Sequence, residues 1–176
     1  VVEILVQRVQ NAHAKRLGVS VETLVDPVHD EVLHDRAVPL RLEDGVGMEQ
    51  SVRDLGALGR GANGGDGLVA ARYLKMAGAS VWAYVCPPKK DADYPELVRV
   101  NREAAIKAGV TIRLVGPESG LREALGQCDI VIDALLGTGS AGKPAGAIHH
   151  AVQEMTRAKK PVIAIDIPTG LHPDTG

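Results

Sequence analysis

The sequence is poor in aromatic residues and in cysteine. It has no phenylalanine, one tryptophan and three tyrosines, so few side chains could stack on the bases of single-stranded nucleic acid. Its two cysteines, Cys86 and Cys128, form no CxxC pair and are too few for a disulfide framework. We therefore expect a reducing, cytoplasmic location and a core built from valine, leucine, isoleucine and alanine.

Strong charge and long apolar runs are also missing. The formal net charge of −2 offers no broad basic surface for nucleic acid. No apolar stretch reaches the ~18 residues that a membrane-spanning helix needs, and the first residues lack a signal-peptide pattern. With 176 residues, 45% of them hydrophobic, the chain can bury the core of one domain. We expect neither nucleic acid nor a membrane as a partner.

Short apolar segments alternate with helical patterns after residue 58. The apolar segments favour strands buried on both faces and cover residues 80–85, 111–115, 129–136 and 161–167. Helical patterns cover residues 66–77, 94–108, 121–125 and 145–158. In the second of these, Leu97 and Val100 belong to the face expected to be buried. The alternation predicts a three-layer, Rossmann-like α/β domain with a mostly parallel sheet and helices on both faces.

The N-terminal part of the chain does not follow this pattern. We interpret residues 1–58 as a divergent segment, with amphipathic helices at 4–17 and 21–33, and residues 59–176 as the Rossmann-like domain. Residues 50–58 include Asp54 and Gly56 and lack the pattern of a buried strand.

A cluster of five glycines occupies residues 59–67, directly before a helical pattern. Glycine lets a ligand approach the backbone, and the free N–H groups at a helix start attract an anion. Asn63 and Asp66 lie inside the cluster. We favour a phosphate-binding segment over a plain turn in which an Asp or Asn caps the helix.

A second glycine-rich segment, Gly137 to Gly142, matches GxGxxG between an expected strand and an expected helix. Asp166 lies 24 residues after Gly142, at the end of the next strand, where dinucleotide-binding folds place an acidic partner for the ribose. We favour ligand contact here over a glycine-lined turn.

Asp133 interrupts the apolar segment 129–136. Aspartate is depleted in strands, and a buried carboxylate without partners is unfavourable. Near the carboxyl end of a strand it would face the usual ligand position of an open α/β sheet. We favour acid–base chemistry or cation binding over a carboxylate that only braces a loop.

Taken in order, these segments resemble the NAD(P)H-hydrate epimerase family, also called the YjeF N-terminal domain. The matching blocks are Asn63–Arg72, Val131–Gly139, Asp166–Gly170 and Asp174–Gly176. Four ordered blocks are more specific than either glycine motif alone.

The sequence also departs from the family. Ala62 stands where the family usually has a second asparagine, and Thr169 replaces the usual serine. The family has an apolar strand at the place of residues 50–58, and it continues beyond Gly176 with further strands. The resemblance therefore implies a truncated C-terminal end of the domain.

The resemblance implies an epimerase that interconverts the R and S epimers at C6 of hydrated NADH or NADPH by acid–base chemistry. It implies catalysis by Asp133 and a potassium ion held by Asn63, Asp133 and Thr169, whose oxygen atoms suit a hard cation. Whether Asp133 moves a proton or only holds the ion stays open. The implied substrate-binding residues are Ala62, Asn63, Gly64, Gly65, Asp66, Gly137, Thr138, Gly139, Ser140, Ala141, Gly142, Lys143 and Asp166.

The partners considered are a dehydratase that repairs one of the two epimers and a second copy of the chain in a homodimer. One alternative is a non-catalytic nucleotide- or protein-binding scaffold of the same fold. Another is a nicotinamide-dependent dehydrogenase. The dehydrogenase is disfavoured for two reasons. The GxGxxG motif follows a late strand of the domain, and the sequence shows no evident catalytic set of His, Lys and Tyr.

Overall fold

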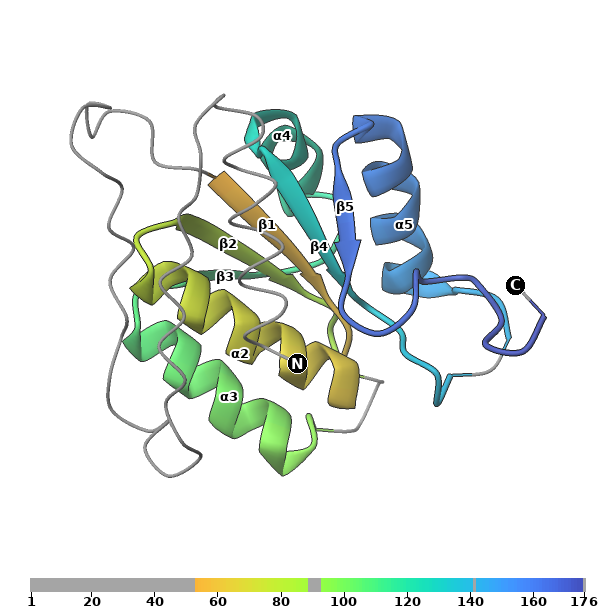
Figure 1. Cartoon of the computed structure of the whole chain (residues 1–176), viewed down its shortest axis with the longest axis horizontal. Helices are drawn as coiled ribbons and strands as arrows, with labels where there is room; N and C mark the ends of the chain where they lie inside the picture. Colours follow the sequence, from red (N-terminus) through yellow and green to blue (C-terminus); the bar gives the residue numbers. More distant parts are fainter. Residues whose placement is uncertain (1–52, 89–92, 141, 176) are drawn as a thin grey trace, which may run out of the picture.

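The computed structural model describes residues 53–88, 93–140 and 142–175 (Figure 1). Within these ranges, five strands form one sheet in the order β3-β2-β1-β4-β5, and every neighbouring pair is parallel. The strands are β1 (Arg53–Leu58), β2 (Ser80–Val85), β3 (Thr111–Leu114), β4 (Ile130–Ala134) and β5 (Val162–Ala164). The helices are α2 (Ala62–Met76), α3 (Glu96–Lys107), α4 (Leu121–Gln127) and α5 (Gly146–Ala158).

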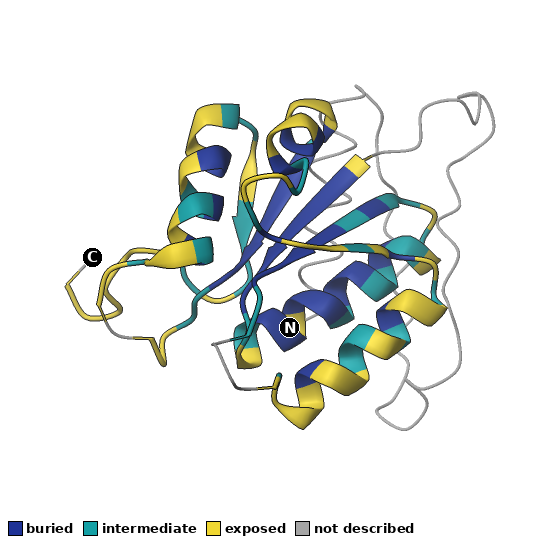
Figure 2. Cartoon of the chain, turned by 180° about the vertical axis from the view of Figure 1, so that it is seen from behind, coloured by how far each residue is buried: buried dark blue, intermediate teal, exposed yellow. Residues whose placement is uncertain are grey.

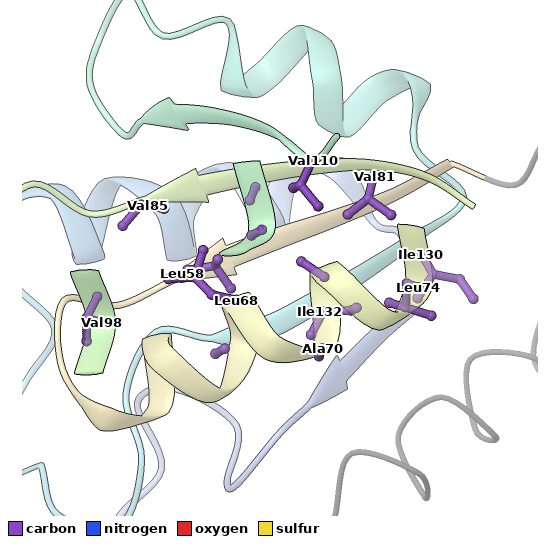
Figure 3. Close-up of a cluster of buried hydrophobic side chains, with 14 residues drawn as sticks. Leu58, Leu68, Ala70, Leu74, Val81, Val85, Val98, Val110, Ile130 and Ile132 are labelled. Carbon is purple, nitrogen blue, oxygen red and sulfur yellow. The ribbon is translucent and has the colours of Figure 1, made fainter. Parts of the chain in front are cut away.

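The helices cover both faces of the sheet, which confirms the predicted three-layer fold. Helices α2 and α3 pack on one face, where Leu58, Leu68 and Ile132 belong to the same buried cluster (Figure 3). Helices α4 and α5 pack on the opposite face, around Leu125 and Val131. Figure 2 shows the burial concentrated on the central strands and on the helix faces turned toward them. No helix in the described part of the chain is long and apolar enough to cross a membrane.

Strand order places the switch point of the sheet between β1 and β4. The chain leaves β1 through α2 on one face and leaves β4 through α5 on the other. Open α/β sheets bind their ligands at this point, in the crevice outside the carboxyl ends of the strands. Both glycine-rich segments follow these two strands, so the fold brings them to the same place.

The interpretation of residues 50–58 was wrong, because residues 53–58 form the central strand β1. This strand pairs with β2 on one side and β4 on the other, and Asp54, like its neighbour Leu55, is fully buried. Strand propensity depends strongly on context, and pairing on both sides outweighs the poor strand-forming character of this segment. The sheet thus includes residues ahead of the domain start expected at residue 59. The helices predicted at 4–17 and 21–33 lie outside the described residues.

Two expectations about burial were also wrong. In α3 the buried side chains are Val98 and Ala105, while Leu97 is 63% exposed and Val100 is 54% exposed. The helix is therefore rotated by about one residue from the predicted face. The edge strands β3 and β5 are mostly exposed or half-buried, because each has a hydrogen-bonded neighbour on one side only among the described strands.

A buried carboxylate joins α5 to α4. Glu154 is 2% exposed and accepts hydrogen bonds from Arg122 Nε at 2.7 Å and from Arg157 Nη1 at 2.6 Å. These bonds, chiefly the one from Arg122, lower the pKa of Glu154 to about 2, so the carboxylate is ionised at neutral pH. The bond from Arg122 on α4 fixes α5, the helix that follows the second glycine-rich segment.

Candidate functional site

The segment after β1 turns directly into α2. Gly59 N–H donates to Ala134 O at 2.9 Å, which ties the end of β1 to β4. Gly61 is the N-cap residue, with an extended backbone and no side-chain cap, and the first turn of α2 contains no acidic residue. Asn63 and Asp66 therefore lie in the helix, and the alternative of an Asp or Asn cap is excluded. The uncapped N–H groups of this helix start are suited to an anion.

Several glycines in the two segments allow protein backbones to approach each other. A Cβ atom on Gly59 would lie 1.9 Å from Leu135 O, and one on Gly64 would lie 1.9 Å from Gly59 O. A Cβ on Gly67 would lie 2.3 Å from Leu58 Cδ2. Gly59 is needed because the β1–α2 and β4–α5 connections touch, Gly64 because α2 packs against the backbone of Gly59, and Gly67 because α2 packs against β1.

Other glycines face open space. A Cβ on Gly61, Gly139 or Gly142 would have no neighbour within 4 Å. These three residues therefore mark the parts of the two segments that a ligand can approach closely, as expected for glycine at a binding loop.

Asp133 lies in β4 and is 4% exposed. Its Oδ1 accepts from the Thr169 hydroxyl at 2.7 Å and from Leu135 N–H at 3.2 Å. Its Oδ2 accepts from Thr169 N–H at 2.8 Å. The predicted position near the carboxyl end of the strand is confirmed, and the three hydrogen bonds give both side-chain oxygens partners in a nearly dry place.

Asn63 and Thr169 meet at the backbone of Leu136. Asn63 Nδ2 donates to Leu136 O at 3.0 Å, and Leu136 N–H donates to Thr169 Oγ1 at 3.1 Å. This hydrogen bond uses the amide nitrogen of Asn63, so the side-chain oxygen Oδ1 remains able to accept another. The side chains of Asn63, Asp133 and Thr169 are thus held around residues 135 and 136 of one connection.

Asp166 lies just beyond β5, and its Oδ2 accepts from Thr138 N–H at 2.7 Å and from the Thr138 hydroxyl at 3.1 Å. Gly137 lies between the two groups of side chains. A Cβ on this glycine would be 2.5 Å from Asp166 Oδ2 and 3.5 Å from Asn63 Cβ. Asn63, Asp133 and Asp166 are therefore gathered at one rim of the sheet, the edge formed by the carboxyl ends of β1, β4 and β5. The sequence predicted this arrangement.

The predicted substrate-binding residues differ in exposure. Asn63 and Gly137 are half-buried, and Gly64 and Gly65 are buried in α2. The exposed ones are Ala62, Asp66, Thr138, Gly139, Ser140, Gly142, Lys143 and Asp166. Ala141 lies outside the described residues. Sequence reasoning missed the backbone of Leu136. Its C=O accepts a hydrogen bond from one side chain and its N–H donates one to another, and a backbone of any residue type can do both.

Cys86 follows β2 at the same rim and is fully buried. Burial raises the pKa of its thiol to about 11, and the charge of Arg60 opposes this shift. Cys128, the other cysteine, is also buried and free. A thiol with this pKa stays protonated at neutral pH.

A cavity of about 250 Å³ reaches Asp133 and Thr169 from the side of α5. Val152 and Met155 of α5 and Val162 of β5 supply its apolar lining. Neither glycine-rich segment lines it. The described residues contain no cluster of three or more His, Cys, Asp or Glu side chains suited to a metal.

Residues 55–176 match the family described as YjeF-related protein N-terminus. The chain belongs to this family. It is 43% identical over 121 residues to the bifunctional NAD(P)H-hydrate repair enzyme Nnr of Thermofilum pendens, covering 67% of this chain and 22% of that protein. It is 36% identical over 119 residues to the NAD(P)H-hydrate epimerase of Elusimicrobium minutum, covering 67% of this chain and 53% of that protein.

The YjeF-related fold is also found in a solved structure. The crystal structure of yeast ynu0, YNL200c, superposes with a TM-score of 0.66 at 24% identity, over 79% of this chain and 56% of that one. This likeness shows a shared fold. The chain spans about half or less of the length of the curated relatives that it matches.

Proposed function

We propose that this YjeF-related chain is an epimerase for hydrated NADH and NADPH. The observation that carries the proposal is the gathering of Asn63, Asp133 and Asp166 at the switch point between β1 and β4. Relatives that are 36% and 43% identical carry the names of an NAD(P)H-hydrate epimerase and of a bifunctional repair enzyme, which supports the same chemistry.

Asp133 is the acid–base residue in this proposal. In the substrate, the hydroxyl at C6 stands beside the ring nitrogen, as in a hemiaminal. A proton delivered to that oxygen breaks the C6–O bond and lets the hydroxyl leave as water, and re-addition of water to the other face, with loss of one proton, gives the second epimer. Asp133 returns to its starting state when it takes the proton back. Its three hydrogen bonds fix the carboxylate in one orientation for this exchange.

The proposal includes a potassium ion held by Asn63, Asp133 and Thr169. The donor set fits, because it consists of an amide, a carboxylate and a hydroxyl oxygen with one formal charge, and hard cations prefer oxygen ligands. A bound ion would supply positive charge to the site that these three residues form. Thr169 also orients Asp133 through its own N–H and hydroxyl.

The substrate contacts in this proposal come from the exposed parts of the two glycine-rich segments. The uncapped start of α2 and the open glycines Gly61, Gly139 and Gly142 form the surface that the dinucleotide lies on. Asp166 has one oxygen engaged by Thr138, so its other oxygen can accept from a ribose hydroxyl. A dehydratase partner, a homodimer and a cytoplasmic location stay predictions.

The test of the function is exchange between the two purified epimers of hydrated NADH, followed by chromatography. With the protein present, we expect each epimer to convert into the other faster than the spontaneous reaction. The same assay with hydrated NADPH examines the second substrate. An exchange rate equal to that of a protein-free sample would refute the epimerase and leave a binding scaffold of the same fold.

The potassium site predicts a dependence of that exchange on the cation. Replacing potassium by N-methylglucamine at constant ionic strength should slow the exchange. The Thr169→Val variant loses one oxygen ligand and should need about tenfold more potassium for half-maximal rate, which corresponds to about 1.4 kcal/mol. Thr156→Val is the matched control, because its hydroxyl on α5 bonds within the helix to Val152 O. An exchange rate insensitive to the cation would show that no ion takes part.

A further inference from the structure

Arg60 stands between two glycines at the end of the central strand. Gly59 before it is bonded to β4, and Gly61 after it caps α2. The side chain is half-buried, and no hydrogen bond or ion pair joins its guanidinium to another residue in the described part of the chain. Arg60 therefore presents its charge at the switch point itself, beside the uncapped start of α2.

The charge of Arg60 reaches across the rim toward β2. It acts on Cys86, the residue that follows β2, and lowers the pKa of that thiol against the larger effect of burial. Cys86 N–H in turn donates to Leu58 O at 2.8 Å, so the ends of β1 and β2 are joined here. Arg60, two residues after Leu58, thus stands beside the joined ends of β1 and β2, while Asp133 and Asp166 belong to β4 and to the connection after β5.

The rim has few cations to balance a dinucleotide. Asp66, Asp133 and Asp166 are acidic, and the described cations are Arg60 in the first glycine-rich segment and Lys143 directly after the second. A substrate of the proposed kind carries a pyrophosphate between its two nucleosides. Arginine matches phosphate oxygens with paired N–H donors and remains charged at all relevant pH values. Helix N–H groups next to it add to the attraction for the same anion.

We propose that Arg60 binds the pyrophosphate of the dinucleotide and is a substrate-positioning residue that the family blocks do not contain. The inference rests on the proposed function, because the substrate is the dinucleotide of that reaction. Ala62, which replaces a polar residue usual in the family, lies two residues further along the same connection. Arg60 supplies a stronger contact close to the one that is absent.

The experiment compares Arg60→Gln with the unchanged protein on three substrates. These are hydrated NADH, hydrated NADPH, and the hydrated form of reduced nicotinamide riboside, which has no phosphate. For both dinucleotides we expect KM to rise about 10- to 30-fold with kcat changed less than about threefold, since one charge-assisted contact is lost. For the riboside we expect the same KM with and without the substitution. Arg60→Lys should recover part of the loss, because the charge remains and the paired donors do not.

Lys107→Gln is the control, since it removes the same charge from the exposed end of α3. The inference is overturned if Arg60→Gln leaves the KM for both dinucleotides unchanged, or weakens the riboside equally. A loss confined to hydrated NADPH also overturns it, because that result assigns Arg60 to the 2′-phosphate. Failure of the proposed function looks different: the unchanged protein then shows no exchange of any of the three substrates.

Discussion

Replacing Asp133 by asparagine should lower kcat/KM for exchange of the hydrated NADH epimers by about 10²- to 10⁴-fold, the usual contribution of a general acid–base group. Asparagine keeps the volume of the side chain and one oxygen to accept the Thr169 hydroxyl. It cannot carry the proton, and its NH₂ group cannot accept the Thr169 N–H bond that Oδ2 now receives at 2.8 Å. Chromatographic exchange rates measure the effect, and denaturant unfolding of both proteins measures any change in stability.

Glu103→Gln is the matched control for this substitution, because it neutralises an exposed carboxylate on α3. The two roles considered for Asp133 give different results. If the residue moves the proton, added potassium will not restore the rate of Asp133→Asn. Recovery at high potassium would show that Asp133 acts by holding the ion. Exchange within about threefold of the unchanged protein, at equal stability, would remove Asp133 from the mechanism.

The position of Asp133 could be predicted because its residue type conflicts with its surroundings. A carboxylate within a continuous apolar segment must find hydrogen-bond partners or face a ligand, and the carboxyl end of a parallel strand is where ligands bind. Both rules can be applied to the amino-acid sequence alone. The identity of its partners could not be predicted, since Thr169 comes from the connection after β5 and reaches Asp133 only in the folded sheet.

The central strand shows where local reasoning fails. Asp54 and Gly56 lower the strand propensity of residues 53–58, yet every residue of this strand after Arg53 is buried. Its burial comes from β2 and β4, which lie far away in the sequence. Strand propensity measured residue by residue cannot include such neighbours, whereas β2, with a strongly apolar sequence, matched its predicted bounds at Ser80–Val85.

The glycines divide into two kinds that look alike in the sequence. Gly59 is required because the β1–α2 and β4–α5 connections touch, and Gly64 because α2 packs against the backbone of Gly59, whereas Gly61 and Gly139 face open space. Both kinds satisfy the same motif. Only the distances to neighbouring backbone atoms separate glycines that serve the fold from glycines that leave room for a ligand, and this separation can be tested by substitution.

Gly59→Ala should therefore destabilise the protein strongly, while Gly61→Ala, two residues away, should not. The new Cβ at residue 59 would lie 1.9 Å from Leu135 O, a backbone atom that cannot turn aside as a side chain can. Relief of this overlap would separate the β1–α2 and β4–α5 connections and break the Gly59 N–H bond to Ala134 O. We expect the free energy of unfolding to fall by about 3–4 kcal/mol.

At residue 61 the added methyl group meets nothing within 4 Å, and the backbone φ of −108° suits alanine. We expect a change within about 0.5 kcal/mol, because loss of a favourable N-cap residue and reduced freedom of the unfolded chain nearly cancel. Urea unfolding at equal m-values compares the two variants. If Gly59→Ala and Gly61→Ala unfold with equal free energies, the β1–α2 and β4–α5 connections do not touch. The arrangement that brings Asn63 beside Asp133 would then also be contradicted.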